Sequence, residues 1–172
     1  MEAFEQSREQ LEEFLGFMEE DIENVRRVIE FCDREDIDAD FIIHGKAETV
    51  EQSSEVKDIE ESRIVKTLVF RCGEEFVAVL CPGDERVDEE KLEEVTGKEV
   101  RMANPEEVEE ATGYVIGGVS PFDLDIQVLM EEKLLERDRV NPAAGSRVVG
   151  AEVDPEELIK RLKAEKVEVV GK

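Results

Sequence analysis

The stretch from Ile64 to Cys81 constrains the fold of this chain more than any other. Residues 64–72 read IVKTLVFRC, residues 75–81 read EFVAVLC, and Gly73-Glu74 stand between them. Two runs rich in β-branched and aromatic residues, joined by a two-residue turn that contains glycine, predict a β-hairpin. Because apolar residues occupy both odd and even positions of the first run, we expect the hairpin to be buried on both faces.

Helical and extended segments alternate around this hairpin. Apolar residues at steps of three and four predict two helices, 3–18 and 21–34, with a break at Gly16 and the acidic cluster 19–21. Further helices should follow the N-caps Asp88, Asn104 and Asp154 and end near Thr96, Thr112 and Lys163, and short strands are expected at residues 40–44, 100–102, 127–130, 146–153 and 167–170. This mixture predicts the α+β class.

The charge of the chain limits its partners. Acidic residues number 47 against 22 lysines and arginines, a formal charge of −25. Such a surface repels nucleic acids and anionic lipids at low salt, so it argues against general polyanion binding, including DNA. Two explanations stay open: a salt-rich cytoplasm that screens the charge, or a hot environment in which charged residues form ion-pair networks.

The N-terminal segment shows the same acidity. Residues 1–21 carry eight acids and one base, a net charge of −7. We therefore expect residues 1–20 to form an acidic helical extension, packed on the outer surface of a domain that spans residues 21–172. The chain starts with acidic residues and holds no apolar run long enough for a membrane span, so a cytoplasmic protein without a membrane partner is expected.

The chain offers few ligands for a metal or a cofactor. Its three cysteines, Cys32, Cys72 and Cys81, form no CxxC pair, and His44 is its single histidine. We expect no metal and no cofactor, and the unpaired thiols suit a reducing compartment.

Lys66 is the strongest candidate for a functional side chain. It interrupts an apolar run and shares parity with Leu68 and Phe70, so it should point toward the same interior. A partly desolvated cation is a strong electrostatic tool. The alternative is a lysine that reaches solvent at the end of the strand or pairs with an acid. Cys81 would stand opposite Lys66 across the hairpin, where a thiol is more often a small core residue than a nucleophile.

A glycine-rich loop, residues 113–122 (GYVIGGVSPF), is the second candidate. Gly117 and Gly118 allow the backbone to approach another group closely, and exposed N–H groups can hold a carboxylate, a phosphate or an oxyanion. The loop lacks the GK[ST] ending of a P-loop, and Ser120 lacks the GxSxG frame of a nucleophile elbow. The alternative is a tight turn between a helix and a strand.

Together these features resemble a known family. Residues 64–69 (IVKTLV), 82–84 (PGD), 101–103 (RMA) before a Pro-Glu-Glu helix, and 112–122 (TGYVIGGVSPF) occur in the order and spacing of the YbaK/ProX family. That family comprises free-standing relatives of the editing domain inserted in bacterial prolyl-tRNA synthetases. The resemblance runs from about residue 21 to residue 163.

The resemblance implies a mixed, mostly antiparallel sheet curled into a barrel-like core around a small pocket, with helices packed outside. It implies a trans-acting deacylase that hydrolyses the ester of mischarged aminoacyl-tRNA, most simply tRNA-Pro carrying Cys or Ala, with prolyl-tRNA synthetase as a possible partner. A different class is the alternative: a non-catalytic pocket protein of the same fold that binds an amino acid, a nucleotide or a partner protein.

The resemblance also assigns roles to residues. Lys66 would lie near the 3′ end of the tRNA, and the loop with Gly117 and Gly118 would stabilise the oxyanion while water or the substrate's own side chain attacks. Substrate-binding roles fall on Gly113, Tyr114, Ser120, Pro121 and Gly145. Inserted editing domains use a late histidine where this chain reads Asn141–Gly145. Binding of tRNA by so acidic a chain calls for a local cluster of bases, with Arg26, Arg27, Arg137, Arg139 and Arg147 as candidates.

Overall fold

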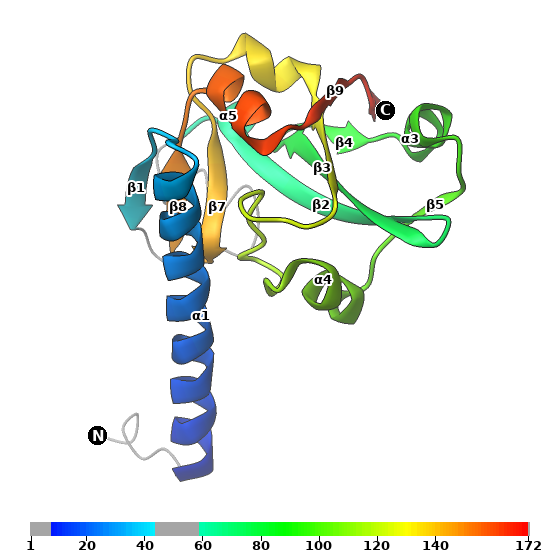
Figure 1. Ribbon diagram of the computed structural model, residues 1–172. Helices are drawn as coiled ribbons and strands as arrows, with labels where there is room; N and C mark the ends of the chain where they lie inside the picture. Colours follow the sequence, from blue (N-terminus) through cyan, green and yellow to red (C-terminus); the bar gives the residue numbers. More distant parts are fainter. Residues whose placement is uncertain (1–7, 44–58, 172) are drawn as a thin grey trace.

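A computed structural model describes residues 8–43 and 59–171 (Figure 1). An eight-stranded sheet forms the body, with strands in the order β1-β8-β7-β2-β3-β6-β9 and β5 paired to β2, and β4 and β10 form a separate pair. The strands are β1 Asp40–Ile43, β2 Ile64–Cys72, β3 Glu75–Pro82, β4 Arg86–Val87, β5 Val100–Met102, β6 Gln127–Glu131, β7 Asn141–Ser146, β8 Val149–Glu152, β9 Glu165–Val167 and β10 Val170–Gly171. The sheet is mixed, because β2–β7, β3–β6 and β6–β9 are parallel and the other pairs antiparallel. The predicted α+β fold with a curled sheet is confirmed, and the sheet is open rather than a closed barrel.

The predicted hairpin is the long β2–β3 pair. Cys72 is opposite Glu75 around the turn, and Lys66 is opposite Cys81, as expected. Alternate residues of β3 enter two different cores. Ala78 and Leu80 belong to the core that contains Val28 and Leu158, whereas Val77 and Val79 belong to the core that contains Leu92. Burial on both faces of the sheet explains why β3 carries apolar residues at both odd and even positions.

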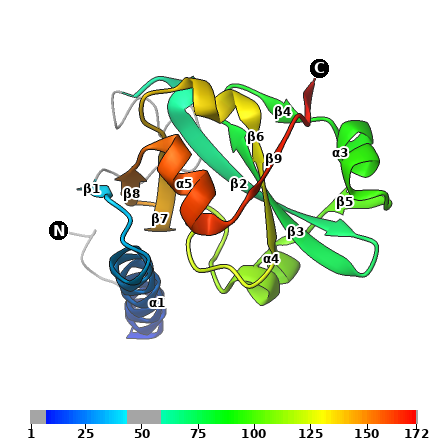
Figure 2. The same cartoon turned by 45° about the horizontal axis from the view of Figure 1, so that its top comes forward.

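Short helices cover the sheet where the sequence predicts them: α3 Glu89–Thr96, α4 Pro105–Thr112 and α5 Pro155–Leu162. Asp88 and Asp154 accept hydrogen bonds from the first turns of α3 and α5, and Asn104 forms a reciprocal capping box with Glu107 on α4. Two 3-10 turns, Glu61–Arg63 and Glu132–Glu136, lead into and out of the sheet. Figure 2 shows α3 and β5 at the end of the molecule opposite to α1.

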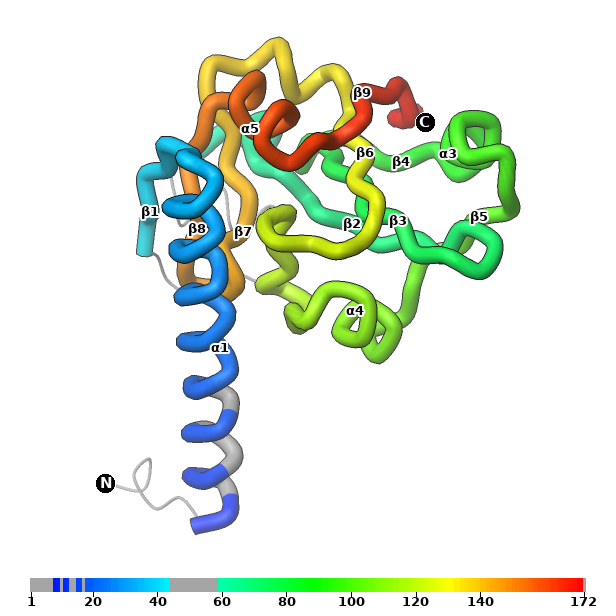
Figure 3. The backbone as a smooth tube through the Cα atoms, viewed as in Figure 1, coloured from blue at the N-terminus to red at the C-terminus, as the bar shows by residue number. Residues whose placement is uncertain are grey.

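The N-terminal helix differs from the expectation. Residues Arg8–Arg34 form one continuous helix, α1, and the predicted break at Gly16 and residues 19–21 is wrong. A glycine within a helix costs only about 1 kcal/mol relative to alanine, and no proline is present to end the helix. The half of α1 before Asp21 extends past the body instead of lying on its surface (Figure 3). The division into an extension and a domain at residue 20 stays a prediction.

Two strand predictions were also wrong in detail. The expected strand 146–153 contains β8, which begins at Val149, and the turn that joins it to β7, which ends at Ser146. The expected strand 167–170 is divided between β9 and β10. The buried carboxylate of Glu131 accepts hydrogen bonds from the N–H groups of Val169 and Val170, at 2.8 and 3.1 Å. These bonds tie the chain between β9 and β10 to the end of β6.

Candidate functional site

Lys66 lies on the wall of an open groove of about 750 Å³. Its side chain is half-buried, and its ammonium donates a hydrogen bond to the backbone oxygen of Glu85, in the turn after β3. Leu68 and Phe70 share the same wall, so the predicted parity is confirmed. The remaining lining residues come from β4, α3 and β5: Arg86, Val87, Asp88, Glu89, Glu90 and Met102.

The groove has both apolar and charged walls. Leu68, Phe70 and Met102 supply apolar surface, and Lys66 and Arg86 supply positive charge. Of the three acids at residues 88–90, Asp88 accepts hydrogen bonds from two backbone N–H groups of α3. Lys66 and Arg86 thus stand beside the carboxylates of Asp88, Glu89 and Glu90, so the charge of the lining is mixed and does not by itself select an anionic ligand.

Cys81 is inert in this setting. It is fully buried opposite Lys66, and its Sγ lies 3.6 Å from the same Glu85 oxygen that holds the lysine. Burial raises the pKa of the thiol to about 11, although the nearby Lys66 acts in the opposite direction. A thiol with this pKa is protonated at neutral pH, so Cys81 serves as a core residue rather than a nucleophile.

The glycine loop follows α4 and lies against β7. A Cβ on Gly118 would stand 3.0–3.1 Å from the backbone of Gly145 and Ser146, and a Cβ on Gly145 would stand 2.7 Å from the backbone of Asn24 in α1. Loop, strand and helix are thus stacked backbone on backbone, which only glycine permits. The close approach expected at this loop is made, in the first place, to the protein itself.

Two arginines hold the loop in place. The guanidinium of Arg27 bonds the backbone oxygen of Thr112 at 2.8 Å and the carboxylate of Asp123 at 2.9 Å, and it stacks 4.2 Å from the ring centre of Tyr114. Arg147 donates two hydrogen bonds to the backbone oxygen of Ile116, at 3.1 and 3.3 Å. Cβ atoms on Gly113 and Gly117 would collide with Arg27 and Arg147, respectively.

Most of the predicted substrate-binding side chains are inside the core. Tyr114 is fully buried, donates a hydrogen bond to the backbone oxygen of Phe122 at 2.7 Å, and has its pKa raised to about 12 by burial. Ser120 and Pro121 are also buried. The N–H of Gly118 is bonded to the backbone oxygen of Val115 at 3.0 Å, whereas Gly117 is exposed at the tip of the loop. Within this loop, Gly113, Ile116 and Gly117 are the exposed residues.

Lys66 and the glycine loop are connected through β7. Parallel pairing places Val65 beside Pro142 on β7, and β7 continues to Gly145, on which Gly118 rests. Among the described residues, however, those that line the Lys66 groove include none from the loop. The two candidate features therefore occupy neighbouring positions along β7, and they do not share one described cavity.

The basic cluster is only partly assembled. Arg27 and Arg147 each bond the backbone at the glycine loop, at Thr112 and Ile116, whereas Arg139 pairs with Asp40 of β1 at 3.1 Å. Sequence reasoning named these arginines and missed their role as supports of the loop, because the Arg27–Asp123 pair joins positions 96 residues apart.

No three His, Cys, Asp or Glu side chains in residues 8–43 and 59–171 are grouped as metal ligands. In the same part of the chain, no helix is both long and apolar enough to cross a membrane. His44, the single histidine, lies outside the described residues.

Comparisons with known proteins relate this chain to aminoacyl-tRNA editing domains. Residues 44–161 match the model of the aminoacyl-tRNA editing domain. The uncharacterized protein YwhH of Bacillus subtilis (strain 168) is 41% identical over 113 residues, which cover 64% of this chain and 72% of YwhH. The proline–tRNA ligase of Caldicellulosiruptor saccharolyticus is 36% identical over 87 residues, which cover 50% of this chain and only 15% of the ligase. A solved structure, "Crystal structure of a putative trans-editing enzyme for prolyl tRNA synthetase", superposes with a TM-score of 0.78 at 27% identity and covers 87% of this chain and 98% of that one.

Proposed function

Since this chain belongs to the family of aminoacyl-tRNA editing domains, we propose that it acts in trans to hydrolyse the ester of mischarged aminoacyl-tRNA. One observation carries the proposal: Lys66, on a strand that resembles the family's lysine strand, lines an open groove together with the apolar side chains of Leu68, Phe70 and Met102. Phosphates and an exposed base at the 3′ end of a tRNA need this combination of charge and apolar surface.

In the proposed reaction, water attacks the carbonyl carbon of the aminoacyl ester, and negative charge builds on the carbonyl oxygen. The bond from this carbon to the ribose oxygen then breaks, the ribose oxygen takes one proton of the attacking water, the other proton goes to solvent, and the amino acid leaves as a carboxylate. Lys66 binds the phosphate that carries the 3′-terminal nucleotide and so fixes the ester, which lowers the entropic barrier to attack. The scheme requires no protein nucleophile, in agreement with the protonated thiol of Cys81.

The glycine loop has a narrower role than the sequence predicts. With the N–H of Gly118 bonded to Val115 and Tyr114 fully buried, the exposed backbone of Gly117 is the part of the loop that can reach a substrate. We propose that its N–H stabilises the oxyanion. Arg27 and Arg147 act as positioning residues, because Arg27 bonds both ends of the loop, at Thr112 and Asp123, and Arg147 bonds Ile116 beside Gly117.

The likeness to proline–tRNA ligases supports a narrower proposal for the substrate. We propose tRNA-Pro mischarged with Cys or Ala as the substrate, and prolyl-tRNA synthetase as the enzyme whose errors are corrected. Because Asn141–Gly145 replace the late histidine of inserted editing domains, the choice between the two amino acids should differ from that of those domains.

A panel of tRNAs mischarged with different amino acids, incubated with the purified chain, tests the proposal. Release of the amino acid from mischarged tRNA-Pro, with correctly charged Pro-tRNA-Pro left intact, is the expected result. Failure to hydrolyse any member of the panel, together with saturable binding of an amino acid or a nucleotide, would favour the non-catalytic alternative and overturn the proposal.

A further inference from the structure

The outer face of α1 carries an apolar seam that the body leaves uncovered. We define the α1 seam as Leu11, Leu15, Met18, Ile22, Val25 and Ile29, whose spacing of four and three residues is the a/d pattern of a coiled coil. Five of the six, all except the half-buried Val25, are 39–51% exposed. A different set of residues, Asn24, Val28 and Cys32, faces the body and is buried. The helix therefore has two apolar faces and uses only one within the monomer.

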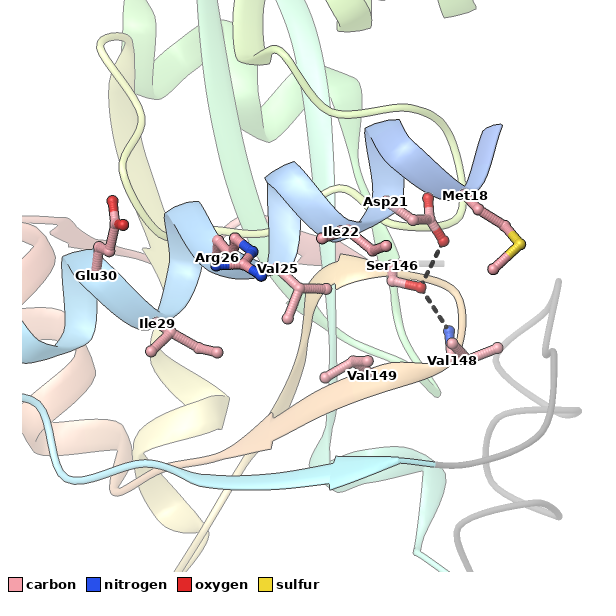
Figure 4. Close-up of a pocket in the computed structure, with 10 residues that line it drawn as sticks. All are labelled: Met18, Asp21, Ile22, Val25, Arg26, Ile29, Glu30, Ser146, Val148 and Val149. Atoms are coloured by element: carbon pink, nitrogen blue, oxygen red, sulfur yellow. Dashed lines mark hydrogen bonds between the residues drawn. The ribbon is translucent and has the colours of Figure 1, made fainter. Parts of the chain in front are cut away.

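A groove runs beside the seam where α1 meets the body. It has a volume of about 610 Å³, and Ile22, Val25 and Ile29 form one wall. Val148 and Val149 form the other wall, across from the helix (Figure 4). The hydrogen bond from Ser146 to Asp21, at 2.7 Å, links β7 to α1 at one end of the groove. Farther toward the N-terminus, α1 extends beyond the body with Leu11 and Leu15 exposed (Figure 1).

The geometry points to a second copy of this chain as the occupant: we propose that two copies pair through antiparallel α1 helices. The two-fold axis passes beside position 20. Each seam residue therefore meets the seam residue of the partner that lies equally far from position 20 on the other side. Leu11 then packs on the partner's Ile29, Leu15 on the partner's Val25, and Met18 on the partner's Ile22. The protruding half of each helix thereby fills the groove of the other copy, which is the isologous contact of a two-fold dimer.

The charges along α1 favour the antiparallel arrangement over the parallel one. Residues 8–20 hold five acids and one base, whereas Arg26, Arg27 and Arg34 all lie in the second half. Antiparallel pairing brings Glu12, beside the seam, next to the partner's Arg26, which is exposed at the edge of the groove. Parallel pairing would place the two acidic halves together, where like charges repel. Complementary charge and the position of the groove thus select the same partner and direction.

The oligomeric state of the full chain tests this proposal. Analytical ultracentrifugation of the wild type should show a monomer–dimer equilibrium that moderate salt strengthens, because two chains of −25 repel each other. Leu15→Glu should weaken dimerisation at least about tenfold, since each dimer contains the change twice. Val95→Glu, on the exposed face of α3, is the matched control and should leave dimerisation within about twofold.

A charge exchange tests the direction of the helices. Glu12→Arg and Arg26→Glu alone should each weaken the dimer, and the double variant should restore it, because only antiparallel pairing makes the two positions neighbours. A wild type that stays monomeric at all concentrations and salts, or a dimer unaffected by Leu15→Glu, would overturn the proposal. A dimer in which the double variant fails to recover would overturn the antiparallel arrangement. Circular dichroism of each variant separates loss of pairing from loss of fold.

Discussion

Lys66 and Cys81 face each other across β2 and β3, and their polar atoms converge on one backbone oxygen, that of Glu85. This oxygen belongs to the turn after β3, which is fixed by hydrogen bonds from the Gly83 N–H to the backbone of Ile64, at 2.8 Å, and from the Glu85 N–H to the backbone of Pro82, at 3.1 Å. The position of the ammonium therefore depends on this turn as much as on the strand that carries the lysine.

Replacement of Lys66 should remove activity without removing the fold. Lys66→Ala is expected to lower kcat/KM for deacylation roughly 10²-fold, because the phosphate that positions the ester for attack loses its contact. Lys66→Arg should recover only part of this loss, because a planar guanidinium cannot make the same single contact with the Glu85 oxygen. Release of labelled amino acid from mischarged tRNA measures the activity, and urea unfolding measures the stability.

Lys91 supplies a matched control for this prediction. Its ammonium also donates to a backbone oxygen, that of Val170 at 2.9 Å, but Lys91 is not among the described residues that line the groove. Lys91→Ala should leave deacylation within about twofold of the wild type. Equal activity of Lys66→Ala and Lys91→Ala would remove Lys66 from the mechanism.

A methyl group on Gly118 should affect packing first. Its Cβ would press on the backbone of Gly145 and Ser146 at 3.0–3.1 Å, so Gly118→Ala is expected to lower the free energy of unfolding by about 1–3 kcal/mol. Gly16→Ala is the control, because a Cβ there meets nothing within 4 Å and alanine favours the helix by up to about 1 kcal/mol. Urea unfolding of both variants checks the prediction, and an unchanged stability of Gly118→Ala would show that the loop does not rest on β7.

The buried thiols should make the fold sensitive to alkali. Burial raises the pKa of Cys32 and of Cys81 to about 11, against 9.0 for an unperturbed thiol. Between these values the unfolded chain loses protons that the folded chain keeps, so stability that is complete below pH 9 falls as the pH rises toward 11. The loss is about 1.4 kcal/mol per thiol for each pH unit within this window. Urea unfolding at about pH 8 and about pH 10.5 measures it, and Cys81→Ala should reduce the difference between the two pH values. An equal difference in the wild type and in this variant would contradict the raised pKa of Cys81.

Local patterns in the sequence were reliable where one short segment decides the structure. The caps at Asp88 and Asn104 each depend on residues within one turn, and the register of Lys66 against Cys81 depends only on the two-residue turn at Gly73. Gly16 shows the limit of such patterns. A weak helix former suggests a break, but the apolar residues on both sides of it keep α1 continuous.

The parts that could not be predicted depend on contacts between distant segments. Burial of Tyr114 follows from Arg27, which stacks on its ring and reaches Asp123 from another element. The resemblance implied that Tyr114 and Ser120 lie at a binding surface. Packing can require the residues of a motif as well, and here both side chains are buried in the core. A glycine in such a loop can likewise be required by a substrate or by packing, and Gly118 and Gly145 lie close to the backbone of their own chain.

Binding of tRNA by this chain should respond to salt in two opposed ways. Added salt weakens the direct contacts of phosphates with cations such as Lys66, but it also screens the repulsion between the tRNA and a protein of net charge −25. At low ionic strength the screening length exceeds the size of any local basic patch, so the net charge dominates and affinity should first rise with salt. Once the screening length falls to about 10 Å, near 0.1 M salt, only the local contacts are felt and affinity should decline. Filter binding of deacylated tRNA-Pro over a salt series measures the curve. A steady decline from the lowest salt upward would show that the cations at the groove outweigh the acidic surface at every distance.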